Sequence, residues 1–398
     1  MKKVKQIKEE KVSRRNFLKT AAVTAGAAAT MGFPAVVKAQ GPISWRWQST
    51  WPTKDIFHEY ALDYAKKVND MTGGDLKIEV LPAGAVVPAF ALLDAVSKGT
   101  LDGGHGVIVY SYGKQHAMAL FGSSPAFGMD ANMLLAWYKY GGGKELRDKI
   151  YASIGANVVS FLYGPMATQP FGWFKKPITK LDDMKGMKFR TVGLAVDMYT
   201  AMGAAVNALP GAEIVPALDR GLLDGAEFNN ASSDRALGFM DVSKVCMLQS
   251  FHQNAEQFEI LFNKDRFNAL PDKMKAILAN AVEAANTDMW WKSIDRGSKD
   301  YIWLQTEAKV KFYKTPDSIL QKQLEIFDGI AERKSAENPL FKEIYESQRE
   351  FAKRAVAWEM DYMVNRRMAY NHYFVPKRAP AKPAAAAPKA PEKAPAKK

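Results

Sequence analysis

The amino-acid sequence predicts an α/β fold with two similar lobes, and three observations lead to this prediction. Short β-rich runs alternate with amphipathic helical patterns, as in largely parallel sheets flanked by helices. The alternation restarts after the segment YGPMATQPF at 163–171. The motif SKGTLDGGHG at 97–106 is echoed by DRGLLDGAEFNN at 219–230. Each half therefore carries a basic residue and a Gly followed by Leu-Asp-Gly. A chain of 398 residues is long enough for two domains of ordinary size.

The first half supplies the elements of the first lobe. Strands are expected in four β-rich runs, which are ISWRWQS, LKIEVL, GGHGVIVY and NVVSFLY. Apolar residues at helical spacing predict the helices between them, in KDIFHEYALDYAKKVNDM, AFALLDAVSKG, ANMLLAWYKY and KELRDKIYASI. Gly73 and Gly74 end the first of these helices.

The second half repeats the alternation. Strands are expected in FGWFKK, MKFRTV, AAVNAL and GAEF, with helices in AVDMYTAMGA and GAEIVPALDRG. Segments 163–171 and 249–258 are expected to cross between the lobes, and Gly164-Pro165 suits a hinge. The predicted first lobe comprises 40–163 plus 252–305, and the second comprises 166–250 plus 306–335.

The C-terminal part is predicted to be mainly helical. The strand EILFN precedes a long helix over about 272–307, and the short strand KVKFYK follows it. A C-terminal helix is expected over 336–375, with an apolar stripe that runs from Phe341 to Tyr362. Such a helix either straps both lobes together or supports a partner subunit, and the sequence leaves both alternatives open.

Both ends of the chain are strongly basic, whereas the body is neutral. Residues 1–39 carry a net charge of +7, residues 376–398 carry +6, and the body balances 39 basic against 39 acidic residues. Net charge therefore gives no support for nucleic-acid binding. The single cysteine, Cys246, excludes an intramolecular disulfide, a Cys-ligated iron–sulfur cluster and a Cys-type zinc site.

The N-terminus has the pattern of an export signal. Arg14-Arg15 and Phe17-Leu18 precede a small-apolar run, which resembles the twin-arginine class that exports folded proteins. The alternative is an ordinary secretory signal with a chance arginine pair. Residues 1–39 are thus expected to be a signal peptide, and the mature protein is expected to be soluble and periplasmic. The Pro/Ala/Lys run at 376–398 is expected to be disordered, either as a solvated spacer or as a weak adhesive for acidic surfaces.

Two polar residues occupy matching positions in the echoed motifs. His105 and Glu227 each follow a tight Gly turn at the end of an expected strand, where ligands of open parallel sheets sit. Glu227 either faces a cleft or forms a local salt bridge. For His105, a satisfied core histidine is the favoured interpretation over a cleft residue.

Arg190 and Gln169 are further candidates. Arg190 lies in the short apolar strand of MKFRTV, where a guanidinium is costly unless it is paired with an anion. Its planar fork suits a ligand carboxylate, and a structural ion pair with an acid of the body is the alternative. Gln169, at the predicted lobe crossing, offers both an acceptor and donors.

Enzyme signatures are sparse. No second His follows His58-Glu59 at helical spacing, no Gly-x-Ser-x-Gly elbow is found, and no Gly-x-Gly-x-x-Gly follows the first strand. Two lobes with a cleft and no catalytic constellation favour a ligand-binding clamp. The rival interpretations are a periplasmic enzyme and a ligand sensor.

These residues also carry a family resemblance. The run ITKLDDMKGMKFRTVGLAVDMYTAMGA, followed by LPGAEIVPALDRGLLDGAEFNN, resembles the extracytoplasmic solute-binding subunits of TRAP transporters (the DctP type). FGMDANMLLAWYKYGGG, EFNN and SFHQNAEQFEILFNK resemble the branch that binds 2-oxo acids and related monocarboxylates. The resemblance covers roughly 41–370 and implies a two-lobed periplasmic-binding-protein clamp, type II-like, with strands exchanged between the lobes and a long helix across both.

The resemblance also implies a site. Arg190 matches the anchor of the ligand carboxylate, and Tyr110 or Tyr112 would close the pocket beside Phe228 and Asn229. A bound cation, sodium or calcium, would be held by Gln169, Glu227, the carbonyl of Phe228 and a further polar group, for which Gln253 and Glu256 compete. No prosthetic group is implied.

The implied function is capture of a 2-oxo or 2-hydroxy monocarboxylate such as pyruvate or lactate, without covalent chemistry. The implied partners are the small and large membrane subunits of the transporter, and a homodimer is compatible with the terminal helix. Two features depart from the family pattern. Phe228 stands where relatives often carry Trp, which bears on the width of the pocket, and the basic tail is not shared.

Overall fold

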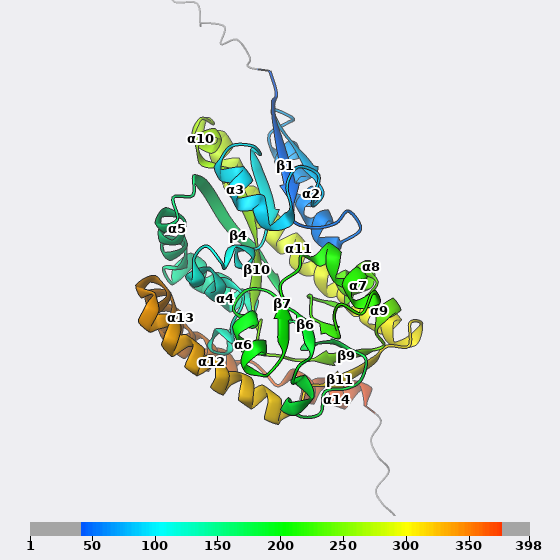
Figure 1. Cartoon of the computed structure of the whole chain (residues 1–398). Helices are drawn as coiled ribbons and strands as arrows, with labels where there is room; N and C mark the ends of the chain where they lie inside the picture. Colours follow the sequence, from blue (N-terminus) through cyan, green and yellow to red (C-terminus); the bar gives the residue numbers. More distant parts are fainter. Residues whose placement is uncertain (1–40, 376–398) are drawn as a thin grey trace, which may run out of the picture.

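The computed structural model describes residues 41–375, which form two β-sheets with helices around them (Figure 1). The expected signal peptide at 1–39 and the tail at 376–398 lie outside the described residues. No helix among residues 41–375 is long and apolar enough to span a membrane.

The first sheet has five strands in the order β2-β1-β3-β10-β4. Its strands β1, β2 and β3 are parallel, whereas β10 runs antiparallel between β3 and β4. Their bounds are β1 (Ile43–Ser49), β2 (Leu76–Leu81), β3 (Gly103–Gly106), β4 (Val158–Met166) and β10 (Glu256–Asn263). We call the part of the molecule built on this sheet the first lobe.

The second sheet has six strands in the order β11-β9-β5-β8-β6-β7 and forms the second lobe. Strand β8 pairs parallel with β6 and antiparallel with β5, just as β3 pairs with β1 and β10. The bounds are β5 (Gly172–Phe174), β6 (Lys188–Arg190), β7 (Ala205–Asn207), β8 (Gly225–Ala226), β9 (Val245–Leu248) and β11 (Lys311–Lys314). The repeated arrangement confirms the α/β fold class and explains the echoed motifs, which lead into β3 and β8.

Two loop connections join the sheets, in addition to the segment 264–310 that carries the chain from β10 to β11. The chain leaves the first sheet after β4 and enters the second at β5, and it returns from β9 to β10. The backbone N–H of Gln169 in the outward connection donates to the carbonyl of Gln253 in the return, at 3.3 Å. The segments predicted to cross between the lobes therefore do so, and they lie side by side. The lobes therefore exchange strands, because β10 belongs to the first sheet but follows β5 to β9 of the second sheet in the chain.

Helices surround both sheets. Short turns of 3₁₀ helix are η2 (Ala89–Ala91), η3 (Ile108–Ser111), η4 (His116–Phe121), η5 (Ala126–Gly128) and η6 (Leu181–Met184). The α-helices up to residue 268 are α2 (Ile56–Met71), α3 (Leu92–Ser97), α4 (Ala131–Tyr140), α5 (Gly143–Ser153), α6 (Ala195–Ala201), α7 (Gly211–Asp219), α8 (Ala231–Leu237), α9 (Phe239–Val242) and α10 (Lys264–Asn268).

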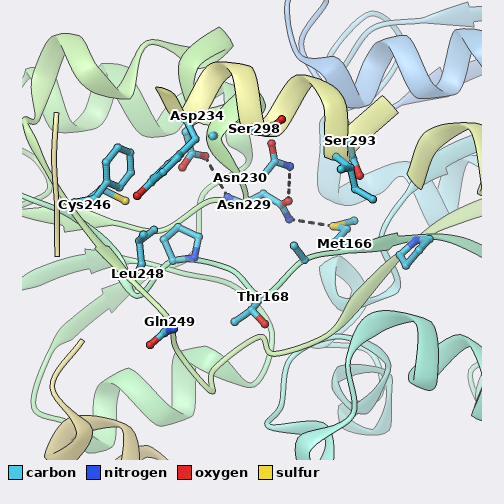
Figure 2. Close-up of a pocket in the computed structure, with 18 of the residues that line it drawn as sticks. Met166, Thr168, Asn229, Asn230, Asp234, Cys246, Leu248, Gln249, Ser293 and Ser298 are labelled. Carbon is cyan, nitrogen blue, oxygen red and sulfur yellow. Dashed lines mark hydrogen bonds between the residues drawn. The ribbon is translucent and has the colours of Figure 1, made fainter. Parts of the chain in front are cut away.

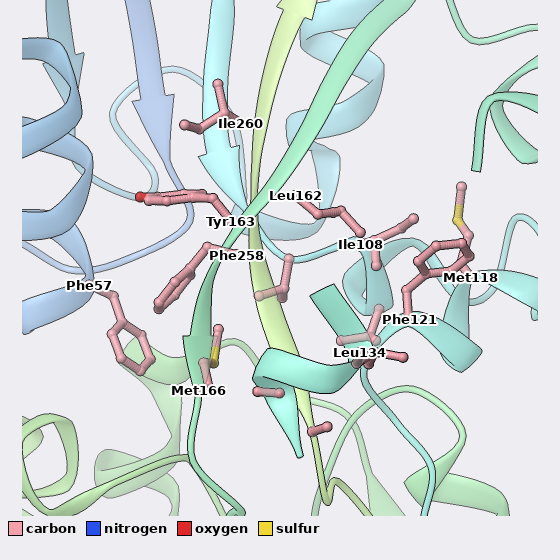
Figure 3. Close-up of a cluster of buried hydrophobic side chains, with 14 of the residues drawn as sticks. Phe57, Ile108, Met118, Phe121, Leu134, Leu162, Tyr163, Met166, Phe258 and Ile260 are labelled. Atoms are coloured by element: carbon pink, nitrogen blue, oxygen red, sulfur yellow. The ribbon is translucent and has the colours of Figure 1, made fainter. Parts of the chain in front are cut away.

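The 35-residue helix α11 (Asp272–Thr306) crosses both lobes (Figure 1). It packs against α2 and β4 of the first lobe and against α8 of the second. Beneath it, aromatic side chains from several elements fill the core around β4 and β10, and Phe258 stacks edge to face on Phe57 at 4.7 Å (Figure 3). The first lobe is thereby tied to a helix that also holds the second.

The C-terminal region differs from the single helix expected over 336–375. Helix α12 (Asp317–Glu337) packs on α6, and α13 (Pro339–Tyr362) packs on α12 and α4. A separate helix α14 (Arg366–Phe374) follows after a break. The break has a local cause, because the Asn365 side chain accepts from the backbone N–H groups of Arg367 and Met368 and so caps a new helix.

Candidate functional site

A small cavity lies where both lobes and both connections meet. Its volume is only about 20 Å³, which is room for about one water. Its walls are mixed aromatic and polar, formed by Trp51, Phe57, Val107, Tyr110, Met166, Gln169, Arg190, Val192, Phe228, Asn229, Gln253 and Glu256.

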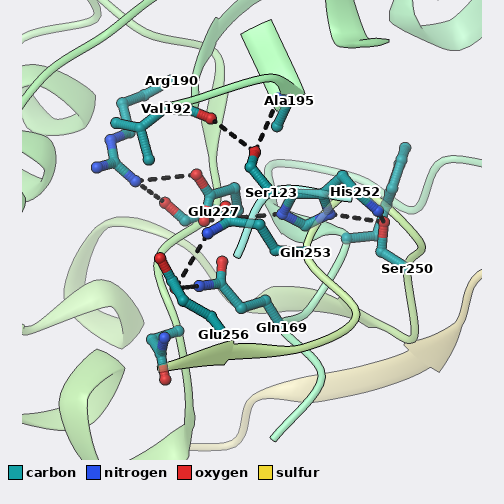
Figure 4. A network of polar contacts seen from close by, with 12 residues as sticks. Ser123, Gln169, Arg190, Val192, Ala195, Glu227, Ser250, His252, Gln253 and Glu256 are labelled. Carbon is teal, nitrogen blue, oxygen red and sulfur yellow. Dashed lines mark hydrogen bonds and ion pairs between the residues drawn. The ribbon is translucent and has the colours of Figure 1, made fainter. Parts of the chain in front are cut away.

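Arg190 ends strand β6, and its guanidinium is buried at 1% exposure. Its Nη1 donates to the Glu227 carboxylate at 2.9 Å and to the Glu227 carbonyl at 3.0 Å (Figure 4). The Nε group donates to the carbonyl of Leu209 at 2.8 Å. The Nη2 group has no hydrogen-bond partner among the described residues. Of the two alternatives for Arg190, the structure contains the ion pair with an acid of the body. The Nη2 group of the guanidinium remains available to a further acceptor.

Glu227 directly follows β8 and lies beside the cavity, not in its lining. Its Oε1 accepts from Arg190, whereas Oε2 has no hydrogen-bond partner and lies 3.9 Å from Nε2 of His252. A buried carboxylate is costly without a counter-charge. Arg190 supplies that charge at one oxygen only, so the other oxygen can still meet a cation or a donor.

Three side chains, two from the connections and one from the start of β10, converge beside this pair (Figure 4). Oε2 of Glu256 accepts from Nε2 of Gln169 at 2.9 Å and from Nε2 of Gln253 at 3.0 Å. This leaves Oε1 of all three side chains without a hydrogen-bond partner in the described part of the chain. Burial and the nearby charge of Glu227 raise the pKa of Glu256 to about 8.

The unpartnered atoms determine what the site can bind. The free oxygens of Glu227, Glu256 and the two glutamines are hard ligands of the kind that sodium or calcium prefers. The described residues contain no cluster of three or more His, Cys, Asp or Glu placed to hold a metal, so the amide oxygens would have to contribute. Beside them, the free Nη2 of Arg190 offers a donor to an anion.

Aromatic side chains limit the size of the site. The Arg190 guanidinium lies 5.6 Å from the Phe228 ring centroid, and Trp51, Phe57 and Tyr110 line the cavity from the first lobe. Sequence reasoning missed Trp51, although its place directly beyond the carboxyl end of β1 is where a ligand contact could have been sought.

The two tyrosine candidates have different positions. Tyr110 lines the cavity, whereas Tyr112 does not. The Tyr112 hydroxyl instead donates to Asp197 of α6 at 2.7 Å, so this residue joins the first lobe to the second. On the other flank, the hydroxyl of Ser233 in α8 donates to Asp55, the N-cap of α2, at 2.8 Å. Both contacts hold the lobes together at the edges of the cleft.

His105 and Asn229 complete the set of predicted residues. His105 takes part in hydrogen bonds with Trp51 Nε1 at 2.8 Å and the Tyr163 hydroxyl at 2.6 Å, and it does not line the cavity. It is the satisfied core histidine that the sequence favoured. Asn229 lines the cavity, with its Nδ2 3.0 Å from the sulfur of Met166.

Comparison with known families identifies most of the chain. Residues 48–337 match the model of the family described as bacterial extracellular solute-binding protein, family 7. Residues 11–31 match the twin-arginine translocation signal, so the chain carries this signal and is directed to the periplasm.

Individual relatives are similar over most of the chain. A monocarboxylate 2-oxoacid-binding periplasmic protein of Nostoc sp. is 33% identical, over 87% of this chain and 96% of the relative. A TRAP periplasmic solute-binding protein of Pseudoalteromonas atlantica, solved with bound sodium and pyruvate, is 28% identical with a TM-score of 0.77, over 84% of this chain and 99% of that one.

A TRAP transporter solute-binding protein of Bordetella bronchiseptica, a mixed-occupancy dimer with calcium and picolinate, has a TM-score of 0.78. It is 25% identical to this chain, and the match covers 84% of this chain and 97% of that one. The two-lobed fold, the matched family and the export signal lead to one conclusion. The chain belongs to family 7 of the bacterial extracellular solute-binding proteins, the solute-binding proteins of TRAP transporters.

Proposed function

We propose that this protein captures a small 2-oxo monocarboxylate such as pyruvate, together with a sodium or calcium ion, and delivers it to the membrane subunits of its transporter. The observation that carries the proposal is the free Nη2 of Arg190, buried beside carboxylate and amide oxygens that also lack partners. A carboxylate at Nη2 and a cation at the oxygens would satisfy both sets of atoms.

The proposed roles follow from the chemistry of each group. Arg190 anchors the ligand carboxylate, with Tyr110, Phe228 and Asn229 around the ligand body. The cation is held by side-chain oxygens of Gln169 and Glu227 and by the Phe228 carbonyl, and Gln253 and Glu256 each offer one more oxygen. The 2-hydroxy acid lactate has the same carboxylate and a neighbouring oxygen, so it is the second ligand class.

Size and relatives favour a small ligand. In this conformation the cavity has room for about one water, so any ligand must widen it, and a three-carbon acid requires a smaller adjustment than a sugar acid does. The relatives from Nostoc and Pseudoalteromonas are a 2-oxoacid-binding protein and a complex with sodium and pyruvate. Because the matched family consists of solute-binding proteins, we propose binding and release without covalent change of the ligand.

Calorimetric titration tests the proposal. Pyruvate is expected to bind with one site per chain in buffer that contains sodium or calcium, and at least about tenfold more weakly when both ions are removed. Lactate is the matched comparison for the 2-oxo group, and acetate is the comparison for the carboxylate alone. Binding of none of these acids, with either ion present, would refute the assignment, and turnover of pyruvate by the pure protein would favour an enzyme.

We further propose that the chain forms a homodimer through the segment 358–375. This segment carries an unusual density of large exposed apolar side chains, namely Trp358, Met360, Tyr362, Met363, Val364, Met368, Tyr370, Tyr373, Phe374 and Val375. Monomeric proteins rarely expose so much contiguous apolar surface. The dimeric relative from Bordetella bronchiseptica also supports the proposal.

Light scattering on two truncated chains tests the dimer. A chain that ends at Val375 lacks only the basic tail and is expected to remain dimeric. A chain that ends at Ala357 lacks the apolar segment and is expected to be monomeric. A full-length protein that is monomeric at micromolar concentration would contradict the proposal, and so would a dimer that survives truncation at Ala357.

A further inference from the structure

A second and larger cavity lies behind the candidate site. Its volume is about 380 Å³, within the range of small-molecule pockets, and we call it the hinge groove (Figure 2). Helix α11 runs along one side with Ser293 and Ser298, and the two connections between the lobes contribute Thr168 and Gln249. The groove is therefore built from the parts of the chain that must adjust when the lobes move.

The lining of the hinge groove is mostly apolar and contains no basic side chain. Larger apolar contributors from both lobes and from α11 and β11 are Met166, Trp173, Leu248, Met289, Trp290, Ile294, Tyr301 and Phe312. None of the described residues that line it is Lys, Arg or His. The one acidic side chain, Asp234, is buried and accepts from Trp173 Nε1 at 2.7 Å and from the backbone of Asn229 at 3.2 Å. An anion would find no counter-charge here, in contrast to the site around Arg190.

The two cavities share one wall. Met166 and Asn229 line both of them and touch each other through the 3.0 Å contact. Along the outward connection, Gln169 lines the small candidate cavity beside Arg190, which we call the front site, whereas Thr168 and Pro170 line the hinge groove. The front site and the groove thus lie on opposite sides of the connection about which the lobes would turn.

We propose that the hinge groove is a second binding site, which takes a small uncharged apolar molecule. The groove has the volume and apolar walls for such a ligand, with amide and hydroxyl groups of Asn230, Ser293 and Ser298 at its edges to meet one polar substituent. The absence of basic lining residues and the buried carboxyl of Asp234 exclude the organic acids that the front site is proposed to take.

Occupancy of the groove favours the closed clamp. A rotation that opens the front site must narrow the groove, because the two lie on opposite sides of the hinge, and a molecule that fills the groove resists that rotation. By linkage, an acid in the front site strengthens binding in the groove by the same factor. The coupling between the two sites rests on the proposed function of the front site, whereas binding of an apolar molecule in the hinge groove does not.

The test uses the neutral fluorescent probe N-phenyl-1-naphthylamine and the full-length mature protein. Saturable fluorescence enhancement is expected with wild type. Gly297→Leu adds a side chain that projects into the groove, since a Cβ at this position meets nothing within 4 Å. Leucine also suits a helix better than glycine does, so the fold is retained. This variant is expected to bind the probe at least about tenfold more weakly than wild type.

The matched control is Gly329→Leu in α12, where a Cβ likewise meets nothing within 4 Å. Gly329 is not among the residues that line the hinge groove. It is expected to bind the probe as wild type does. Absence of saturable binding, or equal affinity in both variants, would overturn the site.

Saturating pyruvate is expected to raise the probe affinity of wild type about fivefold or more. An unchanged or lower affinity, with pyruvate shown to be bound, would overturn the coupling. If pyruvate does not bind at all, only the proposed function fails, because the probe titration still decides the groove.

Discussion

Arg190→Ala is expected to abolish pyruvate binding and to destabilise the fold. The guanidinium is the one positive charge in the lining of the front site, so a ligand carboxylate loses its counter-charge when it is removed. Breaking the buried ion pair with Glu227 costs about 3–5 kcal/mol of folding stability. Separately, loss of one partner of a buried charge pair in a complex costs about 2–5 kcal/mol of binding free energy, which is an affinity loss of about 30-fold or more. Calorimetric titration with pyruvate measures the first effect and urea denaturation the second.

A double variant separates the two effects. Arg190→Ala leaves Glu227 buried without the partner at 2.9 Å, and this uncompensated carboxylate accounts for most of the lost stability. Adding Glu227→Gln removes that charge, so the double variant is expected to recover much of the free energy of unfolding. It still has no anchor for the ligand and is expected not to bind. Pyruvate affinity within threefold of wild type in either variant would show that Arg190 is purely structural.

Glu227→Gln is expected to remove the response of pyruvate binding to the cation. The substitution keeps the shape of the side chain but takes away the negative charge of the free Oε2. A hard cation is bound chiefly by charged oxygen, so sodium and calcium lose their strongest protein ligand. We expect wild-type affinity for pyruvate to rise with added calcium, and the variant to bind about 10- to 100-fold more weakly with no rise.

Glu259→Gln is the matched control for this substitution. Glu259 is also a buried glutamate, held by hydrogen bonds from Tyr151 and Ser160, but unlike Glu227 it makes no ion pair with Arg190. Its replacement is expected to lower stability and to leave the calcium response intact. A Glu227→Gln protein that still responds to calcium in otherwise metal-free buffer would show that the cation does not use this carboxylate.

The repeated architecture was predictable because its signals are local. Hydrophobic periodicity gave the strands and helices, and the echoed Leu-Asp-Gly turns marked β3 and β8 as equivalents. The break before α14 was missed, because large apolar residues continue beyond Tyr362 at Met363, Val364 and Met368, while a single residue, Asn365, caps the new helix. A capping side chain competes with a periodic pattern that looks uninterrupted.

The candidate site was predictable only where a short stretch of sequence reveals a functional residue by itself. Arg190 within an apolar strand signalled a buried cation, and the structure places Glu227 against it. Sequence could not decide between Tyr110 and Tyr112, because two neighbours in one turn face different surroundings once the lobes are in place. The contributions of Trp51 and Phe57, and the hinge groove as a whole, depend on contacts between segments far apart in the chain, which no local pattern records.

Strand β10 has a consequence for how the molecule is made. This strand lies inside the first sheet, between β3 and β4, yet a ribosome reaches it only after every residue of β5 to β9 has emerged. Until residue 263 is synthesised, the first sheet therefore lacks its β10 strand, and the edges of β3 and β4 that pair with β10 stay unpaired. Because each sheet takes strands from both sides of the other along the chain, neither half is expected to fold by itself, and an export route that accepts folded chains suits this topology.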